Sequence, residues 1–70
     1  MTYSKALRLL LARSGMSQAD LARATGMSTA YISQLCKGST KEPTLSKAFA
    51  IADALGVKLQ DFVDLMETDE

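Results

Sequence analysis

The chain has 70 residues, of which 47% are hydrophobic and 23% charged, and eight basic residues balance eight acidic ones. This size and composition indicate one small globular domain rather than a disordered segment. With one cysteine and no histidine, the chain excludes an internal disulfide, a Cys/His metal site and a histidine general base. No apolar run approaches the roughly 18 residues of a membrane span, and no secretory signal is visible. We therefore expect a cytoplasmic protein that needs no metal or cofactor.

The charges are distributed unevenly along the chain. Up to Lys41, six bases accompany one acid, which gives +5, and from Glu42 onward two bases accompany seven acids, which gives −5. Such a separation predicts a face that binds a polyanion, with the acidic remainder turned away from it. The alternative is chance variation among charged helix surfaces.

The first half of the chain predicts three helices. Tyr3–Ser14 carries leucines at the i, i+4, i+7 spacing of an amphipathic helix and is followed by Gly15. Ser17 is expected to cap a short second helix, Gln18–Thr25, with an acid three residues on in a variant of the capping box. After Gly26, Ser28 is expected to cap a third helix, about Thr29 to Lys37.

The second half predicts two more helices. Thr44 is expected to cap a helix that ends at Gly56, and Leu45, Ala48, Ala52 and Leu55 share an apolar stripe on it. A final helix is expected from about Leu59 to Met66. No segment alternates with period two for long enough to predict a strand. The prediction is an all-α domain of five short helices over residues 1–66, followed by an acidic, frayed tail at 67–70.

Four residues have the spacing of a helix-turn-helix. In a twenty-residue window that starts at Gln18, Ala22 is fifth, Gly26 ninth, Ile32 fifteenth and Leu35 eighteenth. A small residue lets the two helices approach, a glycine allows the turn, and two aliphatic residues form the buried ridge of the second helix. The register of all four predicts this motif at the centre of the chain.

The run SQADLARATGMSTAYISQLCKG resembles the helix-turn-helix of the Cro/repressor family of phage and bacterial regulators, also called XRE-like. GSTKEPTL and AIADALGVKLQDFV resemble the fourth helix and the start of the fifth in that family, so the resemblance covers about Leu7 to Val63. It implies a lambda-repressor-like domain that binds double-stranded operator DNA as a symmetric homodimer.

Under this resemblance, the outward side of 29–37 would enter the major groove. The candidate base-reading residues are Ser28, Thr29, Ala30, Ser33 and Gln34. Gln34 can contact an adenine through two hydrogen bonds, and Thr29 or Ala30 can touch a thymine methyl. The candidate phosphate-binding residues are Gln18, Tyr31, Lys37, Ser39, Thr40 and Lys41. An alternative for Tyr31 is a partly buried packing role.

The sequence departs from the family at three positions. Glu42 stands where relatives often carry a basic residue, so it would repel the DNA backbone or face away from it. Leu11 and Cys36 stand where relatives often carry an arginine and a glutamate that form a buried ion pair. Replacing both partners of such a pair with apolar groups is often neutral or stabilising. We therefore expect Leu11 and Cys36 to pack against each other rather than to form a redox site.

Leu9 and Leu65 fall outside the predicted buried stripes. By analogy with the family, dimerisation would use the fifth helix, with Leu65 and Met66 in the interface. The predicted function is that of a sequence-specific transcriptional regulator, a Cro-like repressor on a palindromic operator, without a small-molecule effector. The alternative is a DNA-binding antitoxin or another protein-interaction module on the same domain. An enzyme is disfavoured, since the chain has no histidine, no phosphate-cradling glycine loop and no clustered carboxylates on a pocket-forming scaffold.

Overall fold

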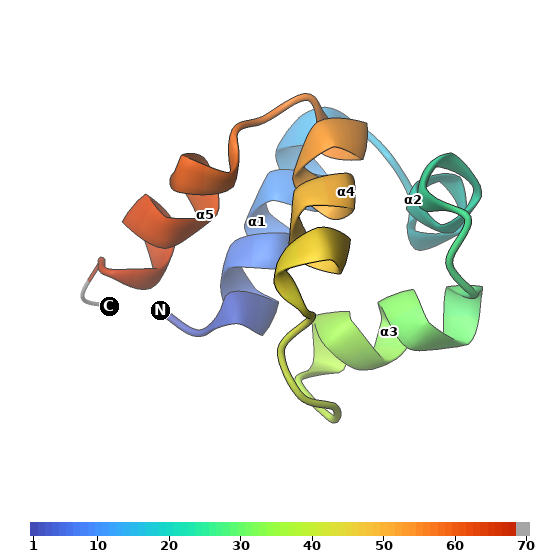
Figure 1. Cartoon of the computed structure of the whole chain (residues 1–70), viewed down its shortest axis with the longest axis horizontal. Helices are drawn as coiled ribbons and strands as arrows, with labels where there is room; N and C mark the ends of the chain where they lie inside the picture. The colour runs from blue at the N-terminus through green and yellow to red at the C-terminus, as the bar shows by residue number, and fades with distance from the viewer. Residues whose placement is uncertain (69–70) are drawn as a thin grey trace.

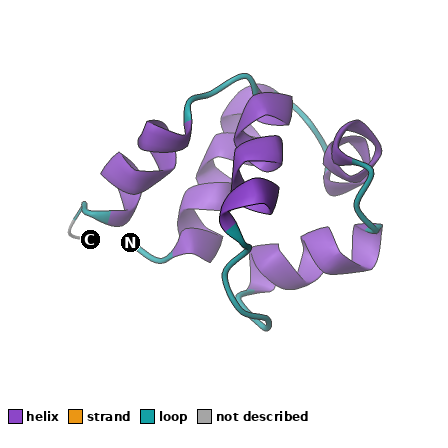
Figure 2. Ribbon diagram, viewed as in Figure 1, coloured by secondary structure: helices purple, strands orange, loops and turns teal. Residues whose placement is uncertain are grey.

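The computed structural model describes residues 1–68, which form five α-helices and no strand. The helices are α1 Tyr3–Ser14, α2 Gln18–Thr25, α3 Thr29–Lys37, α4 Leu45–Leu55 and α5 Leu59–Met66. Figure 1 shows α2 and α5 at opposite ends, α1 and α4 between them, and α3 along one edge. Short loops join the helices (Figure 2). The prediction of an all-α domain with five short helices is confirmed.

Hydroxyl side chains begin four of the helices. Each accepts a hydrogen bond from the backbone N–H three residues later, and the pairs are Thr2 with Lys5, Ser17 with Asp20, Ser28 with Tyr31 and Thr44 with Lys47. A cap of this kind stabilises a helix by about 1 kcal/mol. Four helices also end at a left-handed glycine. These local signals explain why the helix bounds are legible in the sequence.

The core is built around α1. This helix packs against α3, α4 and α5, while α2 packs against α3 and α4. The buried side chains are apolar, and the core cluster is Tyr3, Ala6, Leu7, Leu10, Leu11, Leu21, Ala22, Ile32, Leu35, Cys36, Ile51, Ala52, Leu55 and Phe62. Within the described residues no charged side chain is buried. The hydrophobic effect is therefore the main force that holds these short helices together.

Leu11 and Cys36 both lie in this core, on the two helices α1 and α3 that pack together. Leu11 is 8% exposed and Cys36 is 2% exposed. Burial raises the pKa of the Cys36 thiol, and the charge of Arg8 opposes that rise. Both positions are thus buried and apolar, as expected, while the direct packing of Leu11 against Cys36 stays a prediction.

The prediction for the apolar stripe of α4 was wrong at one position. Leu45, expected to be buried, is 73% exposed, whereas Ile51 is fully buried. Leu45 lines an open groove of about 240 Å³ instead of packing inside. Phe49 is also 63% exposed. Leu45 and Phe49 are four residues apart and share one side of α4, while Ala48 between them is buried. Periodicity identifies the apolar side of a helix, but not which part of that side the neighbouring helices cover.

The two ends of the described chain meet at α5. The N-terminal ammonium of Met1 donates hydrogen bonds to the carbonyl oxygens of Leu65 at 3.3 Å, Met66 at 2.9 Å and Thr68 at 2.7 Å. The Thr68 hydroxyl donates to the Asp64 carbonyl at 3.0 Å. Of the predicted frayed tail, residues 69–70 lie outside the described residues.

Tyr3 packs its ring in the core but has an unpaired hydroxyl. The ring stacks on Phe62 with centroids 5.1 Å apart and planes inclined by 14°. Its buried hydroxyl has no hydrogen-bond partner among the described residues. Burial, the largest cause, raises the pKa of Tyr3 above the ordinary value of 10.0. An unpaired buried hydroxyl costs about 1–3 kcal/mol.

Tyr3→Phe should therefore raise the free energy of unfolding by about 1 kcal/mol at neutral pH. The wild-type protein should lose stability as the pH rises above the ordinary tyrosine pKa of about 10, because its unfolded state releases the Tyr3 proton more readily than its folded state. Tyr3→Phe should remove that part of the loss. Urea unfolding at neutral pH and at a pH above about 10 measures both effects. Tyr31→Phe is the control for a half-exposed hydroxyl. An equal or lower stability of Tyr3→Phe would show that the hydroxyl is satisfied.

Candidate nucleic-acid interface

The turn between α2 and α3 is fixed by local hydrogen bonds and one glycine. The Ser17 hydroxyl accepts from the Asp20 N–H at 3.0 Å, and the Asp20 carboxylate accepts from the Ser17 N–H at 3.1 Å. Gly26 ends α2 with φ at 75°, a conformation that favours glycine. Ser28 then caps α3, its hydroxyl accepting from the Tyr31 N–H at 3.0 Å. The result is two short helices joined by a tight turn.

Helix α3 has one buried side and one outward side. Ile32, Leu35 and Cys36 are buried, at 0%, 2% and 2% exposure. The structure brings the candidate base-reading residues together on and around the outward side: Ser28, Thr29, Ala30 and Gln34 are exposed and Ser33 is half-buried. This surface carries hydroxyl, methyl and amide groups of small size. A helix of this kind can enter the major groove of B-DNA, which is about 12 Å wide.

The candidate phosphate-binding residues lie around the ends and edge of α3. Gln18, Tyr31 and Thr40 are half-buried, whereas Lys37, Ser39 and Lys41 are exposed. Gln18 is the first residue of α2, where free backbone N–H groups favour an anion. Lys37, Ser39, Thr40 and Lys41 follow one another at and just after the end of α3, so the chain places two cations there.

Ser39 has a structural function in that loop. Its backbone N–H donates to the Gln34 carbonyl oxygen at 3.1 Å, and its hydroxyl donates to the same oxygen at 3.5 Å. Gly38 precedes it with φ at 75°, and a Cβ on Gly38 would lie 3.1 Å from the Ser4 hydroxyl oxygen on α1. The loop after α3 is therefore seated closely against α1.

An ion pair modifies the charge of α2. Asp20 pairs with Arg23 one turn later. The pKa of the Asp20 carboxyl is lowered, first by its hydrogen bonds with Ser17 and then by the Arg23 charge. Arg23 therefore has its own counter-ion near the motif. In the loop between α3 and α4, Glu42 is exposed and lines a small cavity together with Thr40.

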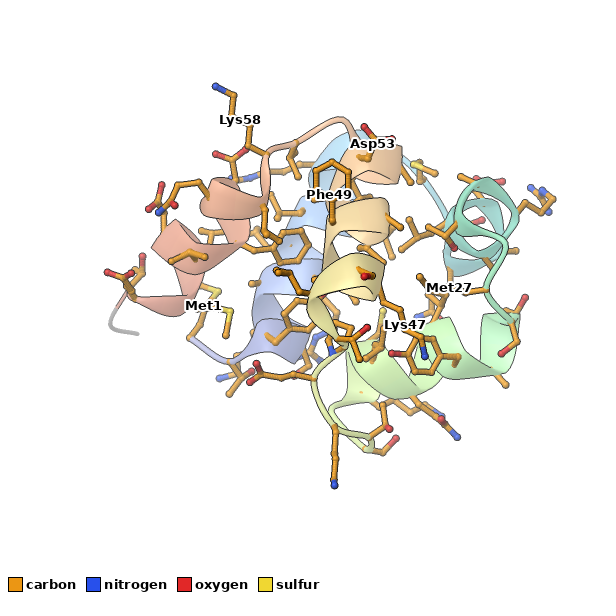
Figure 3. The ribbon with its side chains drawn as sticks, in the orientation of Figure 1. Met1, Met27, Lys47, Phe49, Asp53 and Lys58 are labelled. Atoms are coloured by element: carbon orange, nitrogen blue, oxygen red, sulfur yellow. The ribbon has the colours of Figure 1, made fainter. Side chains whose placement is uncertain are left out.

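Sequence reasoning misplaced two cations. Arg13 belongs to the basic half of the chain, but it lines a cavity of about 400 Å³ together with Asp61 and Asp64 of α5. Lys47 belongs to the acidic half, but its Nζ lies 4.8 Å from the centroid of the Tyr31 ring on α3. Figure 3 shows Lys47 directed from α4 toward α3. Both positions depend on helix packing, so no local sequence signal identifies them.

Leu65 and Met66, the predicted dimer residues, are half-buried against the core. The most exposed large apolar side chains of the described residues are instead Leu45, Phe49 and Val63, at 73%, 63% and 38%. Figure 3 shows Phe49 on the face of α4 turned toward the viewer.

None of the described helices is long and apolar enough to cross a membrane. No group of three potential ligands in residues 1–68 is arranged to hold a metal ion.

Comparison with known proteins agrees with this geometry. The sequence profile of a helix-turn-helix family matches residues 5–62. The restriction-modification controller protein C.AhdI from Aeromonas hydrophila is similar in structure, with a TM-score of 0.79 and 25% sequence identity over 86% of this chain and 89% of that one. No curated protein matches the sequence. The chain belongs to the XRE-type helix-turn-helix family of DNA-binding transcriptional regulators.

Proposed function

We propose that this protein is a Cro-like transcriptional repressor that binds a palindromic operator as a homodimer, with one α3 helix in each of two successive major grooves. The observation that carries the proposal is the outward side of α3, where small hydrogen-bonding groups are exposed and cations stand at the end of the helix. Large charged side chains on that side would hold the helix away from the bases. The proposal assigns the chain no catalytic step.

Each type of side chain among the base-reading residues suits a different base contact. The Gln34 amide both donates and accepts, which matches the N6 and N7 atoms of adenine, and one such bidentate contact discriminates by about 1–3 kcal/mol. The methyl groups of Thr29 and Ala30 suit a thymine methyl, and Ser28 and Ser33 supply hydroxyls to either type of base edge. Since all of these side chains are short, the α3 backbone has to lie deep in the groove.

The phosphate contacts supply most of the affinity. Gln18 with the N-terminus of α2 is suited to a phosphate on one side of the groove. Lys37 and Lys41, with Thr40, are suited to a phosphate beyond the end of α3. Each neutralised phosphate releases counter-ions, so binding should weaken steeply with salt.

An apolar patch of Leu45, Phe49 and Val63 supports the homodimer. It spans α4 and α5 and borders the groove of about 240 Å³ that Leu59, Phe62 and Met66 also line. We favour a second copy of the chain as the partner that covers this patch. The molecule measures 31 × 24 × 22 Å, so two copies side by side have a size compatible with half-sites one helical turn apart, about 34 Å. Similarity to a controller protein supports a regulator rather than the antitoxin alternative.

Selection of bound duplexes from a random-sequence pool tests the proposed function directly. The enriched sequences should form an inverted repeat with half-site centres about 10 base pairs apart. A reporter promoter that overlaps the selected site should be silenced when the protein is present. The absence of any enriched sequence would overturn sequence-specific binding, and enrichment of one unrepeated half-site would overturn the dimer.

Gln34→Ala should relax base preference at one position in each half-site, at a cost of about 1–3 kcal/mol for the preferred base. Lys41→Ala should weaken binding to all duplexes alike and lower the salt slope by about one unit. Competition binding with singly substituted operators separates the two effects, and each variant is the control for the other. A Gln34→Ala protein with unaltered base preference would remove Gln34 from the reading surface.

Phe49→Glu should convert the dimer to a folded monomer, because it places a charge inside the apolar patch at an exposed position. Sedimentation equilibrium measures the change in mass, and circular dichroism confirms that the helices remain. Ala12→Glu is the matched control, since it adds the same charge at an exposed position of α1 that belongs neither to the patch nor to the lining of the groove. A wild-type protein that is already monomeric at high concentration would contradict this interface.

A further inference from the structure

Lys47 belongs to the acidic half of the sequence, but the fold places it beside α3. It is the third residue of α4, is exposed, and places its Nζ 4.8 Å from the centroid of the Tyr31 ring. No carboxylate among the described residues forms an ion pair with it. In Figure 3 the other cation of that half, Lys58, projects outward near the start of α5, far from α3.

The position of Lys47 follows from how the helices pack. Helix α3 packs on α1 and α2, and α4 packs mainly on α2 and α5. The long Lys47 side chain therefore reaches from α4 to α3 across a region where the two helices have little direct packing. Tyr31 receives it on the flank of α3, in the first turn, beside the base-reading residues Thr29 and Ala30.

An ammonium group over an aromatic ring keeps most of its capacity to bind an anion. The ring attracts the cation through its quadrupole without neutralising the charge. The three Nζ donors need different partners, and one ring face occupies only one side of the group. The ring thus restricts a flexible side chain while its charge remains available.

We propose that Lys47 binds a DNA backbone phosphate on the side of the groove next to α4, and that Tyr31 is a positioning residue that holds the ammonium there. This contact stands at the start of α3, whereas Lys37 and Lys41 stand at its end. The recognition helix is then flanked by cations at both ends. The inference rests on the proposed DNA-binding function.

Salt dependence distinguishes this contact from a purely structural bridge between α4 and α3. Lys47→Gln should lower the slope of log affinity against log salt by about 0.9 on a mixed-sequence duplex. The ratio of wild-type to variant affinity should then be about 3.5 times larger at about 50 mM than at about 200 mM salt. Lys58→Gln, which also removes one charge from the acidic half, should leave the slope unchanged, and Lys47→Arg should restore it.

The Tyr31 ring is tested separately from its hydroxyl. Tyr31→Leu should reduce the change in salt slope that a further Lys47→Gln substitution causes, because the aromatic ring no longer holds the ammonium in place. Tyr31→Phe keeps the ring and should leave the effect of Lys47→Gln at its full size. Thermal unfolding of each variant shows whether a loss of binding reflects a loss of fold.

The outcomes separate the two levels of the proposal. If the wild-type protein binds no duplex with a salt-dependent affinity, the proposed function itself fails. If the wild-type protein binds and Lys47→Gln has the same slope as Lys58→Gln, Lys47 makes no phosphate contact. If Lys47→Gln lowers the slope but Tyr31→Leu leaves its effect unchanged, the contact holds and the positioning role of Tyr31 is wrong.

Discussion

The structure depends on the burial of one side of α1. Five helices of 8 to 12 residues are each too short to be stable in water alone. Leu7, Leu10 and Leu11 of α1 give α3, α4 and α5 a common surface to pack on. The surface that α3 presents to its ligand is therefore a property of the whole core. No part of α3 is held by a disulfide or a buried charge in the described residues.

Charge in this molecule is organised by packing rather than by position in the chain. The sequence divides into halves of +5 and −5, but the fold exchanges one cation between them. Arg13 lies among the acids of α5, and Lys47 lies beside the recognition helix. The exchange leaves the total charge on each side the same. The side of α3 next to α4 nevertheless carries a cation, Lys47, that comes from the acidic half of the sequence. Electrostatic surfaces of small domains follow from which helices meet.

Much of the fold is readable from the sequence because its signals are local. Thr2, Ser17, Ser28 and Thr44 bond within one turn of themselves, so the helix starts need no tertiary information. The outward side of α3 follows from the burial of Ile32 and Leu35 at helical spacing. The exposure of Leu45 and the contact of Lys47 with Tyr31 were not predictable, since both depend on how α4 packs against the other helices.

Helix α4 carries Lys47 toward α3 and, two residues later, exposes Phe49 on another side. If Phe49 meets a second subunit, a single rigid helix connects the symmetry axis to the DNA backbone without an intervening linker. Moving the half-sites apart by one base pair rotates one against the other by about 35°, and an eleven-residue helix cannot absorb that twist. Under the proposed dimer and the proposed Lys47 contact, the protein would therefore select the spacing of the half-sites as well as their bases.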